Sequence, residues 1–203
     1  MNSGDLIVRF AILSDIHENY HNLLLCIEDM KRQNINQVLF LGDFMNAGIT
    51  RMLATAGFPV FAILGNNDGD LIAIYKESIS SSSTMKLHPR TYAKHTQGDL
   101  RFFLTHHEDL VDLAVDSGRF DVVLFGHTHR SSIERRGECL VVNPGELSAH
   151  KYGKPTYAIL DSIQNSCIIQ ELEGGVTVRT EPVAHQYHRL GFDEHFGYVK
   201  TTT

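Results

Sequence analysis

Residues 122–129 read VVLFGHTH, and this stretch decides how the rest of the chain is interpreted. Its four apolar residues end at Gly126, which predicts a buried strand that delivers His127 and His129 into a loop. Imidazoles separated by one residue cannot share a helix face, but on an extended strand tip they can face two neighbouring metal ions. An isolated pair of this kind is equally consistent with surface loop histidines, so the interpretation depends on how the other strands end.

Four other predicted strands end in polar clusters of the same kind. The apolar runs at residues 8–13, 37–41, 60–64 and 100–105 lead into Asp15 and His17, into Asp43, into Asn66-Asn67-Asp68, and into His106-His107, respectively. Strands that alternate with helices at this spacing form βαβ units, whose functional side chains gather at the carboxyl ends of the strands. The sequence therefore predicts one site assembled from several strand tips.

The remaining segments predict a two-sheet fold. Helices are expected after Asn19 or Asn22, at residues 49–56 and at residues 108–118, and the serine-rich residues 78–84 are expected to form a mobile surface loop, with a lid role as the lesser alternative. Short strands broken by Gly and Pro follow at residues 132–136, 139–143, 156–161, 167–172 and 176–179, which predicts a second, largely antiparallel sheet. The expected architecture is α/β: two sheets packed face to face with helices outside.

Composition and charge limit the class of protein. The 203 residues are enough for one domain, and no apolar run approaches the ~20 residues of a membrane span. Three scattered cysteines and an N-terminus without a secretory signal predict a soluble cytoplasmic protein. The formal net charge of -6 argues against strong nucleic-acid binding, which needs a basic face. Association into a homo-oligomer stays open.

The strand-tip residues form a set of metal ligands without a thiolate. The set consists of Asp15, His17, Asp43, Asn66, His106, His127 and His129. Carboxylate, amide and imidazole ligands suit two divalent ions, with Mn favoured and Fe, Ni or Zn as alternatives. Seven ligands are too many for one open site, but they divide into two sets of four if Asp43 bridges two ions about 3.5–4 Å apart.

The order of these motifs resembles the calcineurin-like metallophosphoesterases. The motifs D-x-H, G-D, G-N-x-D, a histidine after an apolar strand, and G-H-T-H follow one another over roughly residues 8–180, as in the compact prokaryotic phosphodiesterase branch, which shares its fold with a retromer subunit. The resemblance implies a four-layer sandwich of two sheets between helices. It also implies one metal held by Asp15, His17, Asp43 and His129, and a second held by Asp43, Asn66, His106 and His127. We expect this domain at residues 1–182, with a C-terminal extension at residues 183–203.

The chain departs from the family pattern at three positions. Asn67 stands where many members carry a histidine that donates a proton, His107 stands where a glycine is common, and Glu146 follows the Asn-Pro-Gly turn in place of a serine. We expect Asp68 to orient a neighbouring side chain as a hydrogen-bond acceptor. The candidate catalytic residues are therefore Asn67, Asp68 and His107.

The predicted function is hydrolysis of small phosphate esters, with diesters expected ahead of monoesters, by a two-metal centre with a bridging hydroxide as nucleophile. The alternatives are a catalytically weak scaffold or binding module of the same fold, a phosphomonoesterase, or a nuclease. The complete set of ligands favours an enzyme over a scaffold, and the lack of a dense Lys/Arg stretch argues against a nuclease.

Overall fold

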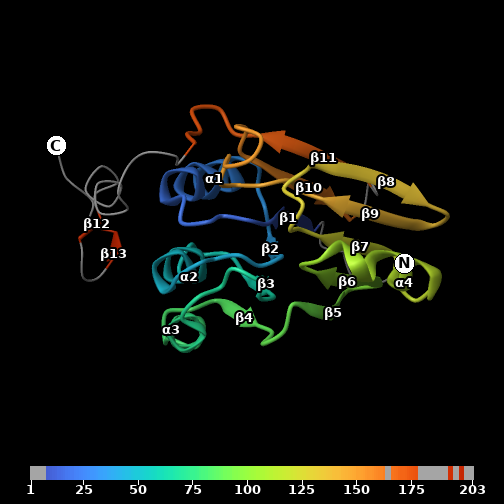
Figure 1. The fold of residues 1–203 in the computed structure, drawn as a ribbon, viewed down its shortest axis with the longest axis horizontal. Coiled ribbons are helices and arrows are strands. Elements are labelled where there is room, and N and C mark those ends of the chain that lie inside the picture. The colour runs from blue at the N-terminus through green and yellow to red at the C-terminus, as the bar shows by residue number, and fades with distance from the viewer. Residues whose placement is uncertain (1–7, 163–165, 178–191, 194–196, 199–203) are drawn as a thin grey trace, which may run out of the picture.

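Two mixed β-sheets pack face to face and carry helices on their outer faces (Figure 1). The computed structural model describes residues 8–162, 166–177, 192–193 and 197–198. The predicted α/β sandwich of two sheets between helices is therefore confirmed.

The first sheet has the strand order β11-β10-β1-β2-β3-β4. Its strands are β1 (Arg9–Leu13), β2 (Gln37–Phe40), β3 (Val60–Ala62), β4 (Met85–Leu87), β10 (Thr156–Asp161) and β11 (Ser166–Glu171). Strands β1 to β4 are parallel, and β10 and β11 are added antiparallel beside β1. The loops that follow β1, β2 and β3 therefore leave the sheet at one edge.

The second sheet has the strand order β5-β6-β7-β9-β8. Its strands are β5 (Tyr92–Gln97), β6 (Leu100–Thr105), β7 (Val122–Phe125), β8 (Ser132–Arg136) and β9 (Cys139–Asn143). The central strands β6, β7 and β9 are parallel, whereas β5 and β8 pair antiparallel at the two edges. The loops after β6, β7 and β9 thus also share an edge.

Polar side chains begin the helices of the first sheet. These helices are α1 (Tyr20–Arg32), α2 (Ala47–Ala54) and α3 (Leu71–Ser78), whereas the 3₁₀ turn η1 (Glu108–Leu110) and α4 (Val111–Asp116) accompany the second sheet and have no side-chain cap. Asn19 rather than Asn22 caps α1, because its Oδ1 accepts the Asn22 N–H at 3.0 Å. Asn46 and Asp70 cap α2 and α3 in the same way, which satisfies backbone donors that the helix itself leaves free.

Strand β1 illustrates how the layers are held together. Phe10 and Ile12 pack between the two sheets, whereas Ala11 and Leu13 pack against the helices on the other face. All four side chains are 0% exposed, as expected of a strand covered on both faces. Burial of each large apolar side chain contributes about 1.5–3 kcal/mol, so the middle of the sandwich is a rigid support for the loops at its edge.

The structure corrects the expected second sheet. Strands β10 and β11, which were expected in the second sheet, pair antiparallel with each other and with β1 and extend the first sheet. The second sheet instead takes β5, which the sequence analysis did not predict, and it is mixed rather than largely antiparallel. A hairpin pattern fixes pairing between neighbours in the sequence, and it carries no information on which sheet edge the hairpin joins.

The serine-rich residues 78–84 run from the last residue of α3 to β4 as a surface loop, in line with the expectation, and the expected mobility stays a prediction. Ser83 Oγ donates to Ser78 O at 2.7 Å, and Thr84 N donates to Ala54 O at 2.9 Å. One further expectation is wrong. Val176 and Thr177 do not lie in a strand, which contradicts the strand expected at 176–179, whose last two residues lie outside the described ones.

The expected extension at 183–203 is described only as the two-residue strands β12 (Phe192–Asp193) and β13 (Gly197–Tyr198). The expected boundary at residue 182 lies outside the described residues.

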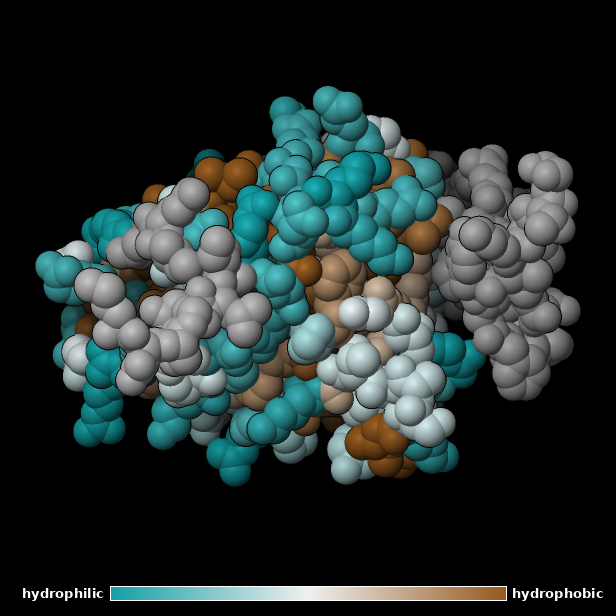
Figure 2. Space-filling model, turned by 180° about the vertical axis from the view of Figure 1, so that it is seen from behind, coloured by the Kyte–Doolittle hydropathy of each residue, from teal (hydrophilic) through white to brown (hydrophobic). Residues whose placement is uncertain are grey.

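One face of the molecule is mostly hydrophilic where the structure describes it. Figure 2 shows one face on which hydrophobic residues form small, separate groups. The exposed apolar side chains of Leu71, Ile72, Tyr75 and Ile79 all belong to α3 or its C-terminal end. Among the described residues, no helix has the length and apolar character needed to span a membrane.

Candidate metal centre

The loops that carry the candidate ligands approach one another so closely that glycine is required. A Cβ atom on Gly65 would lie 2.1 Å from Asp43 Oδ1, and one on Gly126 would lie 2.1 Å from Ser14 Oγ. Both distances are far below van der Waals contact, so a larger residue would displace the neighbouring loop. The glycines that precede Asn66 and His127 are thus part of what brings the strand tips together.

The backbone at the strand tips is strained. Five candidate ligands have left-handed φ values: Asp15 at 54°, His17 at 43°, Asp43 at 64°, His127 at 61° and His129 at 64°. This conformation costs a non-glycine residue roughly 1 kcal/mol or more. Strain of this kind persists where the surrounding structure holds it and where the side chain must point in one direction, which is typical of a functional site.

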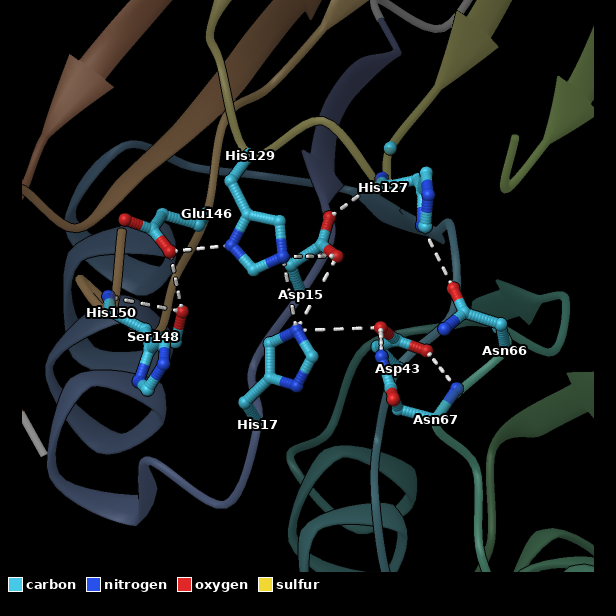
Figure 3. Close-up of polar contacts among 12 residues, drawn as sticks. Asp15, His17, Asp43, Asn66, Asn67, His127, His129, Glu146, Ser148 and His150 are labelled. Atoms are coloured by element: carbon cyan, nitrogen blue, oxygen red, sulfur yellow. Dashed lines mark hydrogen bonds and ion pairs between the residues drawn. The ribbon is translucent and has the colours of Figure 1, made fainter. Parts of the chain in front are cut away.

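Asp15, His17 and His129 form the first set of converging ligand atoms (Figure 3). His17 Nε2 and His129 Nε2 are 3.3 Å apart, and Asp15 Oδ1 lies 3.5 Å from the former and 3.3 Å from the latter. The two imidazole rings stack with centroids 4.9 Å apart. Two ring nitrogens and one carboxylate oxygen therefore face a common point.

Asn66, His106 and His127 form the second set. Asn66 Oδ1 lies 2.8 Å from His106 Nε2 and 2.8 Å from His127 Nδ1. His106 is 0% exposed, and its Nδ1 donates to Leu41 O at 2.7 Å. That bond leaves His106 Nε2 as the nitrogen with a lone pair, directed at the other two members of the set.

Asp43 lies between the two sets. Its Oδ2 is 3.3 Å from His17 Nε2 and 3.5 Å from His106 Nε2. The carboxylate is 0% exposed, and Asn67 holds it with two bonds of 2.8 Å, from the backbone N–H to Oδ1 and from Nδ2 to Oδ2. One carboxylate oxygen thus faces both sets at once.

The donor atoms fit a divalent cation. Asp15 Oδ1 is buried and has no hydrogen-bond partner among the described residues, while Oδ2 of the same carboxylate accepts the His127 N–H at 3.1 Å. A buried carboxylate oxygen left without a donor is costly unless a cation lies beside it. The ligand atoms of Asp15, Asp43 and His106 lie within 4.8 Å of one another, as do those of the first set.

The charges around Asp15 and His17 favour a cation as well. Burial would raise the pKa of Asp15, but His17 and the nearby imidazoles outweigh burial and lower this pKa overall. Burial would lower the pKa of His17, but the carboxylates of Asp15 and Asp43 outweigh burial and raise that pKa. Asp15 is thus favoured in its ionised form, and its negative charge favours a positive charge nearby. A site for a metal cation requires the same conditions.

Glu146 belongs to the site, although the sequence analysis identified it only as a departure from the family pattern. Its side chain is buried at 1% exposure, and its Oε2 lies 2.6 Å from His129 Nδ1. Burial would raise the pKa of Glu146, but hydrogen bonds from His129, Tyr152, Lys151 and Ser148 outweigh it and lower the pKa to about 2. The sequence signal that pointed to Glu146 was the presence of an acidic residue directly after Pro-Gly.

The three candidate catalytic residues make different contacts. Asn67 binds Asp43, as described above. Asp68 accepts the N–H groups of Gly65 at 2.7 Å and Met45 at 3.0 Å, so it secures the loop backbone and does not orient Asn67. His107 is partly exposed, and its ring centroid lies 4.5 Å from that of His127, beside the second set. Of the three, only His107 lies beside a candidate ligand with a titratable ring, because its ligand atom is within 4.8 Å of one on His127.

Sequence comparison places the chain in a family. A model of the calcineurin-like phosphoesterase superfamily domain matches residues 8–165. The chain belongs to this superfamily. The match spans β1 to β10 and includes every residue of the two sets, Asp43 and Glu146. The resemblance seen in the order of the motifs is thereby confirmed.

Similar members of the superfamily carry phosphodiesterase names. Phosphodiesterase MJ0936 of Methanocaldococcus jannaschii is 32% identical over 157 residues, which cover 76% of this chain and 93% of that protein. Phosphodiesterase YfcE of Escherichia coli K12 is 31% identical over 166 residues, which cover 76% of this chain and 88% of that protein. These relatives support a phosphoesterase.

Solved structures of other proteins share the fold. An archaeal phosphodiesterase aligns with a TM-score of 0.73 at 29% identity, over 81% of this chain and 100% of that one. Vacuolar protein sorting 29 from Cryptosporidium parvum aligns with a TM-score of 0.58 at 16% identity, over 82% of this chain and 97% of that one. The second likeness concerns the fold alone.

Proposed function

We propose that this calcineurin-like phosphoesterase hydrolyses phosphodiesters with two divalent ions, one held by each set of ligands and both by Asp43. The observation that carries the proposal is the position of Asp43 Oδ2, which is 3.3 Å from His17 Nε2 and 3.5 Å from His106 Nε2. A carboxylate oxygen that faces both sets is suited to bridge two ions, and Mn is the ion we expect.

The residues of the chain hold and orient the reacting groups. Divalent ions bound there supply Lewis acidity, which lowers the pKa of water toward ~7 and offsets charge on the phosphoryl oxygens. Asp15 and Asp43 contribute the negative charge that retains such ions, and both carboxylates are buried away from competing water. Asn67 fixes the rotamer of Asp43 through its two hydrogen bonds. The strained loops keep these groups in place before substrate arrives.

Proton supply to the leaving group distinguishes this chain from family members with a histidine at the position of Asn67. An amide cannot transfer a proton, and the Asn67 amide is already bonded to Asp43. His107, whose ring lies 4.5 Å from that of His127, is the imidazole we propose for this role. We therefore expect a modest general acid, and substrates with good leaving groups should react best.

A comparison of diester and monoester substrates tests the proposal. Purified protein is loaded with Mn and assayed with bis(nitrophenyl) phosphate and with nitrophenyl phosphate. We expect faster turnover of the diester, because one fewer negative charge lets a nucleophile approach phosphorus more easily. Asp43→Asn should abolish turnover, whereas Asp29→Asn, which changes a buried carboxylate beside Tyr157 and away from the site, should retain it.

The outcomes separate the alternatives. Preference for the monoester would make the chain a phosphomonoesterase. Protein that binds Mn at neither set and turns over neither ester would support the scaffold or binding module.

The cytoplasmic location remains part of the proposal, and it agrees with the three free cysteines Cys26, Cys139 and Cys167.

A further inference from the structure

Glu146 is a buried carboxylate in direct contact with a candidate ligand. Its Oε2 lies 2.6 Å from Nδ1 of His129, and both side chains are almost fully buried, at 1% and 5% exposure. Figure 3 shows Glu146 on the side of the His129 ring opposite to Asp15 and His17. The contact is therefore made through the ring nitrogen that does not face the first set.

Several donors fix the carboxylate of Glu146. Its Oε1 accepts the N–H groups of Lys151 at 2.8 Å and Tyr152 at 2.7 Å, and its Oε2 accepts the Ser148 hydroxyl at 2.8 Å. Hydrogen bonds to an ionised carboxylate are short and strong, and a group that receives several of them has little rotational freedom. Glu146 is thus held in place independently of His129.

The loop that carries Glu146 is also tied to the loop that carries Asp15. Leu147 N donates to Ser14 O at 3.1 Å, and Ser148 N donates to Asp15 O at 3.0 Å. These bonds fix the position of the Glu146 carboxylate relative to the first set. An imidazole between a fixed carboxylate and Asp15 has only one orientation available.

The contact also decides which nitrogen of His129 carries the proton. An ionised carboxylate only accepts hydrogen bonds, so Nδ1 of His129 must donate. The lone pair of neutral His129 is then on Nε2, which lies 3.3 Å from His17 Nε2 and 3.3 Å from Asp15 Oδ1. We infer that Glu146 is a positioning residue that fixes His129 as the Nδ1–H tautomer and strengthens metal binding by the first set.

This inference rests on the proposed function only in that the first set holds a metal ion. Carboxylates behind a ligand histidine fix its orientation and make it a better donor, and their removal typically weakens metal affinity by about 10- to 100-fold. The competing explanation is that Glu146 serves only to stabilise the turn at residues 148–152, through its bonds to Ser148, Lys151 and Tyr152.

Metal titration of Glu146→Gln separates the two explanations. The full chain, freed of metal, is titrated with Mn by calorimetry, and the two steps are assigned with Asp15→Ala and His106→Ala. We expect Glu146→Gln to weaken the step that belongs to the first set by about 10- to 100-fold and to leave the other step within about threefold. Asp29→Asn is the matched control, because it removes the charge of another buried carboxylate, to which Tyr157 donates at 2.6 Å.

The tautomer is measured separately on the metal-free wild type. In ¹⁵N-histidine spectra, with His129→Gln used for assignment, we expect one strongly downfield Nδ1 proton from His129. An Nε2–H tautomer in this spectrum would overturn the inference without any Glu146 variant, which matters if Glu146→Gln does not fold.

Each result of the titration has one meaning. Equal Mn affinity of Glu146→Gln and wild type at the first set would leave Glu146 with a purely structural role and refute the inference. An equal loss in Asp29→Asn would refute it too, since the effect would then come from general destabilisation. Wild-type protein that binds no Mn but shows the Nδ1 proton would instead refute the proposed two-metal function.

Discussion

The two halves of the candidate metal centre differ in what stands behind their histidines. In the first set, His129 is backed by the ionised carboxylate of Glu146 at 2.6 Å, whereas in the second set His106 is backed by the neutral carbonyl of Leu41 at 2.7 Å. The first set also has its own carboxylate, Asp15, and the second has the amide of Asn66 in the corresponding place. Negative charge is thus concentrated on one side, and we expect the first set to bind its ion more tightly.

The largest expected effect comes from the residue that both halves share. Asp43→Ala removes the oxygen that faces His17 and His106, so both ions should be lost from the purified protein and turnover should fall by at least ~10³-fold. Elemental analysis after dialysis measures the metal content. Retention of both ions in Asp43→Ala would show that the two sets are independent.

Variants of one half should remove one ion. Asp15→Ala should abolish the tighter binding step and His106→Ala the weaker one, as measured by Mn titration. The expected difference between the two steps in wild type is about tenfold or more, since an added carboxylate ligand or a carboxylate behind a histidine contributes on this order. Two equal steps in wild type would contradict the asymmetry drawn from Glu146 and Asp15.

Asn67 and His107, which lie beside Asp43 and His127, should govern how the rate depends on the leaving group. Because Asn67 cannot supply a proton, rates of wild type should fall steeply as the leaving-group pKa rises across substituted phenyl and alkyl esters. Asn67→His should speed the poor leaving groups by about 10- to 100-fold, which is below the 10²- to 10⁴-fold typical of general acid catalysis, because Asp68 is bonded to Gly65 and Met45 and is not free to orient a new imidazole. His107→Ala should steepen the dependence further, and an unchanged slope would exclude His107 as the donor.

The smallest effect belongs to an ion pair between α2 and α3 that includes no candidate ligand. Arg51 donates to Glu77 at 2.9 Å and 2.6 Å, and this hydrogen bond is the main reason why the pKa of Glu77 is lowered. A lowered pKa in the folded state means that the pair stabilises the protein above the unfolded value of 4.5 and that this contribution is lost as the pH falls through the folded value. Glu77→Gln should lower the free energy of unfolding by about 0.3–1 kcal/mol at pH 7 and by nothing at pH 2. Metal titration of this variant should match wild type.

Local sequence signals predicted most of the strands and the place of the site. Runs such as residues 122–125 are apolar because both faces are covered, and the runs before Gly42, Gly65 and Gly126 end at a glycine that the close approach of another loop requires. Strands β10 and β11 were predicted as short strands, but their antiparallel attachment beside β1 was not. Attachment depends on contacts between residues about 150 positions apart, and no pattern within the hairpin encodes them.

Glu146 shows the corresponding limit within the site. The strand-tip residues were recognised because several strands end in the same kinds of side chain at the same position. Glu146 follows an Asn-Pro-Gly turn, and no other segment of the chain shows the same pattern. Its role arises from the approach of the 146–152 loop to His129, which only the folded chain creates. Asp68 was predicted as a hydrogen-bond acceptor and is one, but its donors are two backbone N–H groups that the sequence could not identify.

The left-handed backbone at Asp15, His17, Asp43, His127 and His129 has an evolutionary consequence. Glycine adopts this conformation without steric cost, and asparagine adopts it more easily than most residues. A descendant of this chain that no longer needed metal ions would therefore gain stability from such replacements, each by up to roughly 1 kcal/mol. Replacement of the ligands would therefore increase the folding stability of this chain, and only continued selection for the chemistry opposes that replacement.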